Sequence, residues 1–160
     1  MHHALLARGF DQLDHAILDE LQEDGRISVA ELARKIHLSA PAVHQRIKRL
    51  ERAGIIQRYA ALVDRESVGY DLLCFVRIGL HALTPPQQEA LRAALREIPA
   101  VLECYGTAGT QDLMLKVVAH NHRELDALLN ERLAALPGVE RIETSLVLNE
   151  IKPPSPLKVR

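Results

Sequence analysis

The stretch SAPAVHQRIKRLERAG, residues 39–54, decides the fold of the first third of the chain. Ser39 can cap the start of a helix, Pro41 is accepted in its first turn, and Gly54 can end it. At about 100° per residue, the apolar side chains between these signals fall within about 60° of one another. These inward-facing residues are Val43, Ile47 and Leu50. The stretch therefore predicts one amphipathic helix.

Two further helical patterns precede this helix. The apolar residues of the first pattern recur at helical spacing: Leu13, Ile17, Leu18 and Leu21. Asp11 or Asp14 can begin this helix, and Ser28 and Glu31 have the spacing of a capping box at the start of the second. A helix, a short turn and a second helix form a helix-turn-helix, whose last helix enters the major groove of DNA. The sequence therefore predicts a DNA-binding domain over residues 1–55.

The face of this last helix opposite its apolar positions is polar and basic. Gln45 has the groups to read adenine and Lys48 those to read guanine, whereas arginine suits phosphate. The predicted DNA-contacting residues are Ser39, Pro41, His44, Gln45, Lys48, Arg49 and Arg52. The alternative is that these side chains only solvate a surface helix. Arg46 lies nearer the inner face, where it can reach a phosphate or pair with an acid of the first helix.

Charge is segregated along a chain that is nearly neutral overall. The 160 residues carry a formal net charge of −1. Residues 11–31 hold seven acidic side chains and one basic one, a net −6, whereas residues 34–58 hold seven basic and one acidic, a net +6. A basic segment of this density indicates a local anion-binding surface. It supports the prediction that double-stranded DNA is the partner.

Composition excludes several classes of protein. Apolar residues make up 48% of the chain and charged residues 26%, which is typical of a globular protein. The longest uncharged apolar stretch, residues 72–76, is too short to span a membrane, and residues 1–8 lack the apolar segment of a signal peptide. Cys74 and Cys104 have the spacing of neither a disulfide framework nor a metal site. We therefore expect no metal or other cofactor, and a location in the reducing cytoplasm.

A strand, helix, strand, strand, helix, strand order follows an extended linker over residues 56–71. The predicted strands span residues 72–80, 101–107, 113–119 and 139–151. Thr84 and Asn121 are placed to cap the two helices. This order is that of the ferredoxin-like βαββαβ fold, so we predict an α+β chain with a ferredoxin-like domain over residues 72–152. The prolines of residues 153–160 predict a loose tail.

An internal repeat supports the ferredoxin-like prediction. At an offset of 38 residues, Pro99 and Val101 match Pro137 and Val139. A sheet with both helices on one side leaves its other face bare. Because the strands place apolar residues on both faces, the bare face is predicted to be an apolar patch that a second copy covers. A homodimer also pairs two DNA-reading helices on a two-fold operator.

The first sixty residues resemble the Lrp/AsnC (leucine-responsive/asparagine regulator) family of prokaryotic transcription factors. The matching segments are Leu13-Asp14, Ile17-Leu18, Leu21-Gln22, Asp24-Gly25-Arg26, Glu31-Leu32-Ala33, Leu38-Ser39, Val43, Arg46-Ile47, Leu50-Glu51, Gly54-Ile55-Ile56 and Tyr59. The resemblance implies a sequence-specific DNA-binding transcriptional regulator. His37 departs from the family, which usually has glycine there. A left-handed backbone at this position costs a non-glycine residue about 1 kcal/mol.

The C-terminal part looks like the effector-sensing domain of the same family. Gly109-Thr110-Gln111-Asp112 matches the family's Gly-x-x-Asp turn, and Leu113 stands where many members have an aromatic residue. The resemblance implies that an amino acid or similar small molecule binds near this turn, between dimers that can assemble into octamers. Backbone N–H groups of the turn can hold a carboxylate, and Asp112 can accept from an ammonium.

The predicted effector-binding residues are Thr107, Gly109, Thr110 and Asp112. Either threonine can add a hydroxyl to the site. The alternative is that Gly109 and Asp112 only shape a hairpin turn.

Two rival functions remain open at this point. The histidines are scattered, and the sequence has neither a Gly-rich phosphate loop nor a nucleophile elbow, so we expect no enzyme. Some Lrp-like chains nevertheless act in haem biosynthesis. A second rival is an architectural protein that wraps DNA with little sequence preference. Discrete footprints on DNA indicate a specific regulator, whereas uniform coverage indicates packaging.

Overall fold

The computed structural model describes residues 11–159. The N-terminal segment in which no signal peptide is expected lies outside the described residues. The chain divides into two compact units. The first runs to Leu62 and takes in the residues from Lys152 onward, and the second spans Val63–Ile151.

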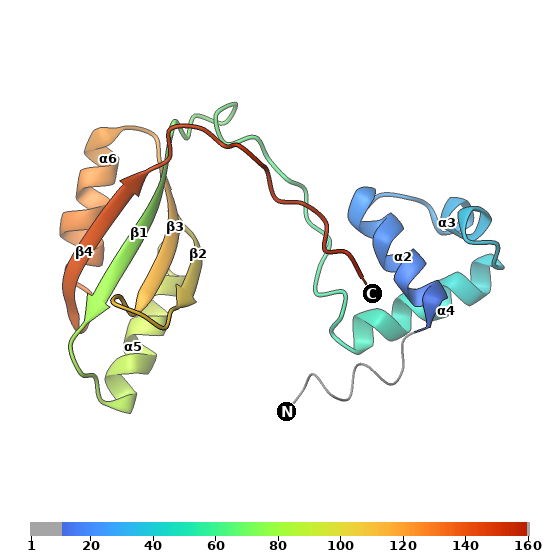
Figure 1. Ribbon diagram of the computed structural model, residues 1–160, viewed down its shortest axis with the longest axis horizontal. Coiled ribbons are helices and arrows are strands. Elements are labelled where there is room, and N and C mark those ends of the chain that lie inside the picture. Colours follow the sequence, from blue (N-terminus) through green and yellow to red (C-terminus); the bar gives the residue numbers. More distant parts are fainter. Residues whose placement is uncertain (1–10, 160) are drawn as a thin grey trace. The chain divides into compact units, whose positions relative to one another are not determined.

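The described residues of the first unit form three helices, as the sequence predicts (Figure 1). They are α2 (Gln12–Glu23), α3 (Val29–Lys35) and α4 (Ala40–Arg52). One apolar core joins them, and its buried members are Ile17, Leu32, Ala33, Val43, Ile47 and Leu50. Because the apolar stripe of α4 is buried in this core, the opposite side of that helix faces solvent.

Side-chain caps set the starts of these helices. The Ser28 hydroxyl accepts from the Glu31 N–H at 3.1 Å, and the Ser39 hydroxyl accepts from the Ala42 N–H at 3.4 Å. The predicted capping box at Ser28 forms only in this half, since the Glu31 carboxylate lies 3.8 Å from Arg34 instead. In the described part of this unit the complete box is at α2, where the side chains of Asp11 and Asp14 each accept from the other's backbone N–H.

The turn between α3 and α4 has the left-handed residue that the sequence predicts. His37 has φ 57°, and the following Leu38 N–H donates to the Ala33 carbonyl at 3.0 Å. This hydrogen bond closes the end of α3 in the way that glycine usually permits. Gly54, with φ 70°, ends α4 in the same manner. The turn therefore keeps its geometry in spite of the His37 side chain.

The second unit is the predicted ferredoxin-like domain. Its elements are β1 (Leu72–Leu80), α5 (Pro85–Arg96), β2 (Val101–Gly106), β3 (Leu113–Ala119), α6 (His122–Ala127), η1 (Leu128–Leu133) and β4 (Val139–Leu146). The antiparallel sheet has the order β2-β3-β1-β4. The π-helical segment η1 continues α6 and was not predicted, because the leucine spacing of the sequence fits an α-helix equally well.

Both helical segments pack on one face of this sheet (Figure 1). The fully buried Cys74, Val76 and Ile78 of β1 meet Leu91 and Leu95 of α5 in one core. Leu128 and Leu133 of η1 join the same core from the neighbouring helix.

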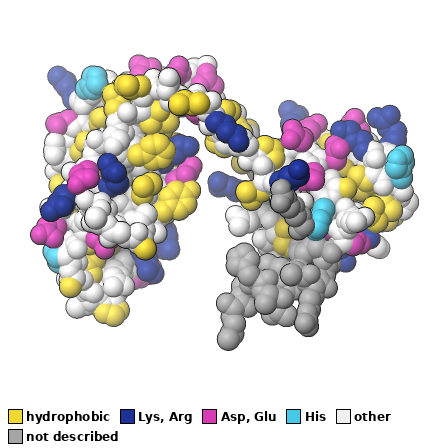
Figure 2. Space-filling view, viewed as in Figure 1, with side chains coloured by type: hydrophobic (Ala, Val, Ile, Leu, Met, Phe, Trp, Pro, Cys, Tyr) yellow, Lys and Arg dark blue, Asp and Glu magenta, His cyan; other side chains and the backbone are white. Residues whose placement is uncertain are grey.

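The opposite face of the sheet is mixed, which corrects the prediction of an apolar patch. Phe75 is 41% exposed on this face, beside the ion pair between Lys116 and Glu103 at 3.3 Å. Arg77 follows two residues later and lies 3.8 Å from Glu143. The prediction rested on the apolar residues of β1, but polar residues of the other three strands also lie on this face. Figure 2 shows hydrophobic side chains lying among charged ones over this unit.

The end of the chain differs from the prediction in two ways. Strand β4 ends at Leu146 and does not reach Ile151. Its neighbour β1 begins at Leu72, so residues beyond the hydrogen bond from the Val147 N–H to the Leu73 carbonyl have no strand to pair with. The tail is also not loose throughout, because the backbone of Leu157 exchanges two hydrogen bonds with the Gln22 side chain, at 2.7 and 2.9 Å.

Candidate functional site

The seven predicted DNA-contacting residues are all exposed in the structure. They comprise Ser39, Pro41, His44, Gln45, Lys48, Arg49 and Arg52. Helix α4 brings them onto one strip, because its apolar residues Val43, Ile47 and Leu50 are 0%, 8% and 1% exposed on the other side. The strip thus presents hydrogen-bonding and cationic groups to solvent along a single helix, as a major-groove reader requires.

Lys48 has an ion-pair partner within the same helix. Its ammonium lies 3.1 Å from the carboxylate of Glu51, and half of the Lys48 side chain is exposed. Glu51 also accepts from the Tyr59 hydroxyl at 3.4 Å. Burial is the main reason why the pKa of Tyr59 is raised above 10, with the negative charge of Glu51 adding to it. An exposed pair of this kind contributes little to stability, so Lys48 remains available to a stronger anion.

A buried carboxylate ties α4 to α2. The Asp14 side chain is 0% exposed and accepts from Arg46 at 2.9 Å and from Arg49. Arg46 also binds Asp11 at 2.8 Å, which confirms the alternative in which Arg46 pairs with an acid of the first helix. The Asp14 backbone N–H, followed by Arg46, lowers the pKa of Asp11 below its usual 3.8. The same two acids raise the pKa of Arg46.

The second predicted site, the turn between β2 and β3, is closed by its own hydrogen bonds. The Thr107 hydroxyl donates to the Gln111 carbonyl at 2.6 Å, and the Thr107 N–H donates to the Asp112 carbonyl at 2.8 Å. The Asp112 carboxylate accepts from the Leu80 N–H at 2.8 Å. Gly109 has φ 156°, with no atom within 4 Å of the place where a Cβ would stand. The structure therefore brings Thr107, Gly109, Thr110 and Asp112 onto one exposed loop.

Gln111, at the base of this turn, was not among the predicted site residues. It is 8% exposed, and its amide nitrogen donates to Glu143 at 3.0 Å. Its amide oxygen is buried and has no hydrogen-bond partner within the described chain. A small hollow of about 140 Å³ adjoins it, lined by Gly79, Leu80, Thr110, Gln111, Asp112, Glu140 and Arg141. A buried acceptor without a donor costs free energy, which a bound donor would recover.

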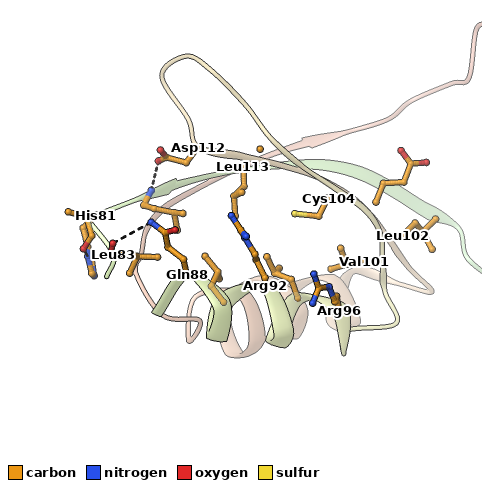
Figure 3. A pocket seen from close by; sticks show the side chains of 16 residues that line it. His81, Leu83, Gln88, Arg92, Arg96, Val101, Leu102, Cys104, Asp112 and Leu113 are labelled. Atoms are coloured by element: carbon orange, nitrogen blue, oxygen red, sulfur yellow. Dashed lines mark hydrogen bonds between the residues drawn. The ribbon is translucent and has the colours of Figure 1, made fainter. Parts of the chain in front are cut away.

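A larger groove of about 860 Å³ runs between α5 and β2 (Figure 3). Its walls include Leu91, Arg92 and Arg96 of α5, Cys104 of β2 and Leu113 of β3. No sequence motif predicted this groove. The spacing of Arg92 and Arg96 places them one helical turn apart, and only the tertiary structure puts them beside the edge strand.

Comparison with known proteins matches both units to one family. Residues 10–57 match the winged helix-turn-helix DNA-binding model, and residues 73–157 match the Lrp/AsnC ligand binding domain. The chain belongs to the Lrp/AsnC family. It is a helix-turn-helix transcriptional regulator with a ligand-binding domain, as the resemblance implies.

Relatives in the Lrp/AsnC family match nearly the whole chain. The leucine-responsive regulatory protein of Rhizobium meliloti is 36% identical over 142 residues, covering 89% of this chain and 91% of that protein. The leucine-responsive regulatory protein of Escherichia coli K12 is 36% identical over 153 residues, covering 96% and 93%.

Solved structures of the Lrp/AsnC family share the fold. A transcriptional regulator of Neisseria meningitidis in complex with L-Met has a TM-score of 0.87 and 34% identity, covering 92% of this chain and 96% of that one. Escherichia coli AsnC has a TM-score of 0.83 and 28% identity, covering 94% and 99%.

Over residues 11–159, no group of three His, Cys, Asp or Glu side chains is placed to hold a metal ion. The same residues include no helix long and apolar enough to cross a membrane. Both cysteines are free; Cys74 is buried and Cys104 is exposed. Desolvation by the surrounding protein raises the pKa of each thiol.

Proposed function

We propose that this protein reads a specific operator through the exposed strip of α4. In this proposal Gln45 and Lys48 contact base edges, while Ser39, Arg49 and Arg52 contact phosphates and Pro41 and His44 lie against the groove. The observation that carries the proposal is the exposure of all seven side chains on the helix face opposite the core. A buried or acid-covered strip would have left no surface for DNA.

The proposed active species is a homodimer, which can assemble further into an octamer. Phe75, 41% exposed, and Tyr105, 55% exposed, lie on the helix-free face of the sheet. A second copy packed on this face would bury both rings and present two α4 helices to a two-fold operator. Sedimentation equilibrium tests this step, and a monomer at micromolar concentration would contradict it.

The proposed effector is an amino acid or a similar small molecule bound at the loop of residues 107–112, between dimers. Asp112 and the unpaired amide oxygen of Gln111 are acceptors suited to an ammonium group. Thr107, Gly109 and Thr110 add hydroxyl and backbone groups suited to a carboxylate. The regulator of Neisseria meningitidis solved with L-Met supports an amino acid as the class of ligand.

Selection of bound duplexes from a random library tests the DNA proposal. We expect enrichment of one motif with two-fold symmetry, lost in Gln45→Ala and Lys48→Ala. Arg34→Ala is the matched control, because Arg34 is an exposed base of α3 outside the strip. Failure of the unmodified protein to enrich any motif, together with uniform footprints, would instead support an architectural protein.

A thermal-shift screen of the twenty amino acids tests the effector proposal. A ligand that binds only the folded protein raises the unfolding midpoint, and above its dissociation constant the stabilisation grows with the logarithm of the ligand concentration. We expect the response to one or a few amino acids to disappear in Gln111→Leu and to remain in Arg123→Ala, which changes an exposed residue of α6. A response that survives Gln111→Leu would place the effector elsewhere.

We further propose that the protein acts in the cytoplasm and catalyses no reaction. The two free cysteines fit a reducing compartment, in which thiols are not paired. Fractionation of the native host, with the protein recovered in the membrane or periplasmic fraction, would contradict the location.

A further inference from the structure

We propose that the groove between α5 and β2 binds an aliphatic monocarboxylate that carries no ammonium group. The carboxylate would meet Arg92, and the tail would lie on the apolar floor. This site is separate from the effector loop of the proposed function, although Asp112 lies at the rim of both.

The groove follows the edge strand β2 on the side of the sheet that the helices cover. Cys104 of β2 pairs with Leu115, which is 0% exposed in the core beneath the helices, so Cys104 points to the same side of the sheet. Yet Cys104 is exposed, and it lines the groove together with residues of α5. A volume of about 860 Å³ is within the range of small-molecule sites.

The floor of the groove is apolar. Leu91 and Leu95 of α5 are only 4% and 6% exposed, and Leu113 of β3 is partly buried beside them. Leu102, at the far end, is 53% exposed and lines the same groove. An aliphatic tail laid here would remove apolar surface from water on both molecules.

The free charge in the groove is positive. Figure 3 shows Arg92 extending from α5 toward Leu113, and in the described chain its guanidinium has no ion-pair partner. Arg96, one turn later, lies 3.6 Å from Glu89 and keeps 71% of its side chain exposed. A guanidinium offers the paired donors that a carboxylate accepts in a bidentate manner.

Two acids line the groove, Glu103 and Asp112. Glu103 accepts from the Tyr105 hydroxyl at 2.7 Å and lies 3.3 Å from Lys116, and both contacts hold the pKa of this carboxyl below its usual range. Asp112 accepts from the Leu80 N–H. The Glu103 carboxylate pairs with Lys116 on the opposite face of the sheet, and Asp112 stands at the end of the groove beside Leu80. The unpaired Arg92 is therefore the charge within the groove and favours an anion over a zwitterion. This asymmetry selects a carboxylate rather than an amino acid.

The test uses the full chain and 4-methylpentanoate as the probe. Cys104 reports occupancy by its rate of alkylation with iodoacetamide, followed by mass spectrometry, and the fully buried Cys74 is the internal control. The unfolding midpoint provides a second reading that does not depend on thiol reactivity. The matched compounds are 4-methylpentanamide, which lacks the charge, and leucine, which adds the ammonium.

We expect 4-methylpentanoate to slow Cys104 alkylation at least fivefold and to raise the unfolding midpoint. The amide and leucine should need at least tenfold higher concentrations for half-protection. Arg92→Gln should raise the half-protecting concentration about tenfold, as loss of a charge-assisted contact does, while Arg123→Gln leaves it unchanged. Equal protection by the amide, or an unchanged concentration in Arg92→Gln, would overturn the proposal. If leucine slows Cys104 alkylation and this effect is lost in Gln111→Leu, the groove would be part of the effector site and the proposal would be overturned. An unaltered midpoint and alkylation rate with every compound would also overturn it.

Discussion

Replacing Asp14 by asparagine removes a buried charge that joins α2 to the DNA-reading helix. Asp14 is 0% exposed and binds Arg46 at 2.9 Å as well as Arg49. Breaking a buried ion pair costs about 3–5 kcal/mol. We expect a loss at the lower end of this range, about 3 kcal/mol. Arg46 retains its ion pair with Asp11 at 2.8 Å, and Arg49, with 55% of its side chain exposed, can reach water. The backbone amides of α4 should then exchange with solvent about 100-fold faster.

The same substitution changes how α4 meets DNA. In the unmodified protein the Asp14 carboxylate offsets the charge that Arg49 offers to its phosphate. With asparagine at position 14 the full charge of Arg49 meets the phosphate, so each DNA-binding head gains the equivalent of up to about one backbone contact. The logarithmic dependence of affinity on salt should steepen by about 0.9 per added contact. Fluorescence anisotropy over a salt series measures this slope.

Asp19→Asn is the matched control for both measurements, because it removes an exposed carboxylate from the same helix. It should leave unchanged both the exchange protection of α4 and the slope of DNA affinity against salt. Protection and slope that are unchanged in Asp14→Asn would refute the role assigned to this contact.

Three further predictions concern single residues. The pKa of Asp11 is lowered in the folded state, so the carboxylate's contribution to stability is complete above pH 3.8 and is lost as the pH falls through the lowered pKa. In Asp11→Asn the free energy of unfolding should therefore fall less steeply over this acid range. His37→Gly should raise the free energy of unfolding by up to about 1 kcal/mol in urea titration, because φ is 57° there; a loss of stability would contradict the strain. Asp112→Asn keeps an acceptor for the Leu80 N–H, so the midpoint without effector should hold while the effector response falls; retention of the full response would exclude this carboxylate.

Much of the fold is predictable because its signals are local. Ser39 and Gly54 mark the ends of α4 by capping chemistry, and strands β1 and β3 have the predicted bounds because their apolar alternation stops at polar turns. The exposure of Gln45 and Lys48 follows from helical geometry once Val43, Ile47 and Leu50 are assigned to the core.

The features that were missed depend on contacts between elements. The length of β4 is limited by where its partner β1 begins, which the sequence of β4 does not contain. The bare face of the sheet is mixed because Glu103 and Glu143 come from strands other than β1. Asp14 has the spacing of an ordinary helix-capping residue, and its two arginine partners arrive only when α2 and α4 pack together.

The most direct test of the central claim compares two dissociation constants of Lys48→Ala with those of the unmodified protein. One duplex carries the selected motif, and the other has the same base composition in scrambled order. Loss of a base-reading side chain should reduce the discrimination between the duplexes by about 5- to 150-fold, the equivalent of about 1–3 kcal/mol, with little change on scrambled DNA. Equal weakening on both duplexes would show that Lys48 contacts only the backbone and would contradict base reading by the exposed strip of α4.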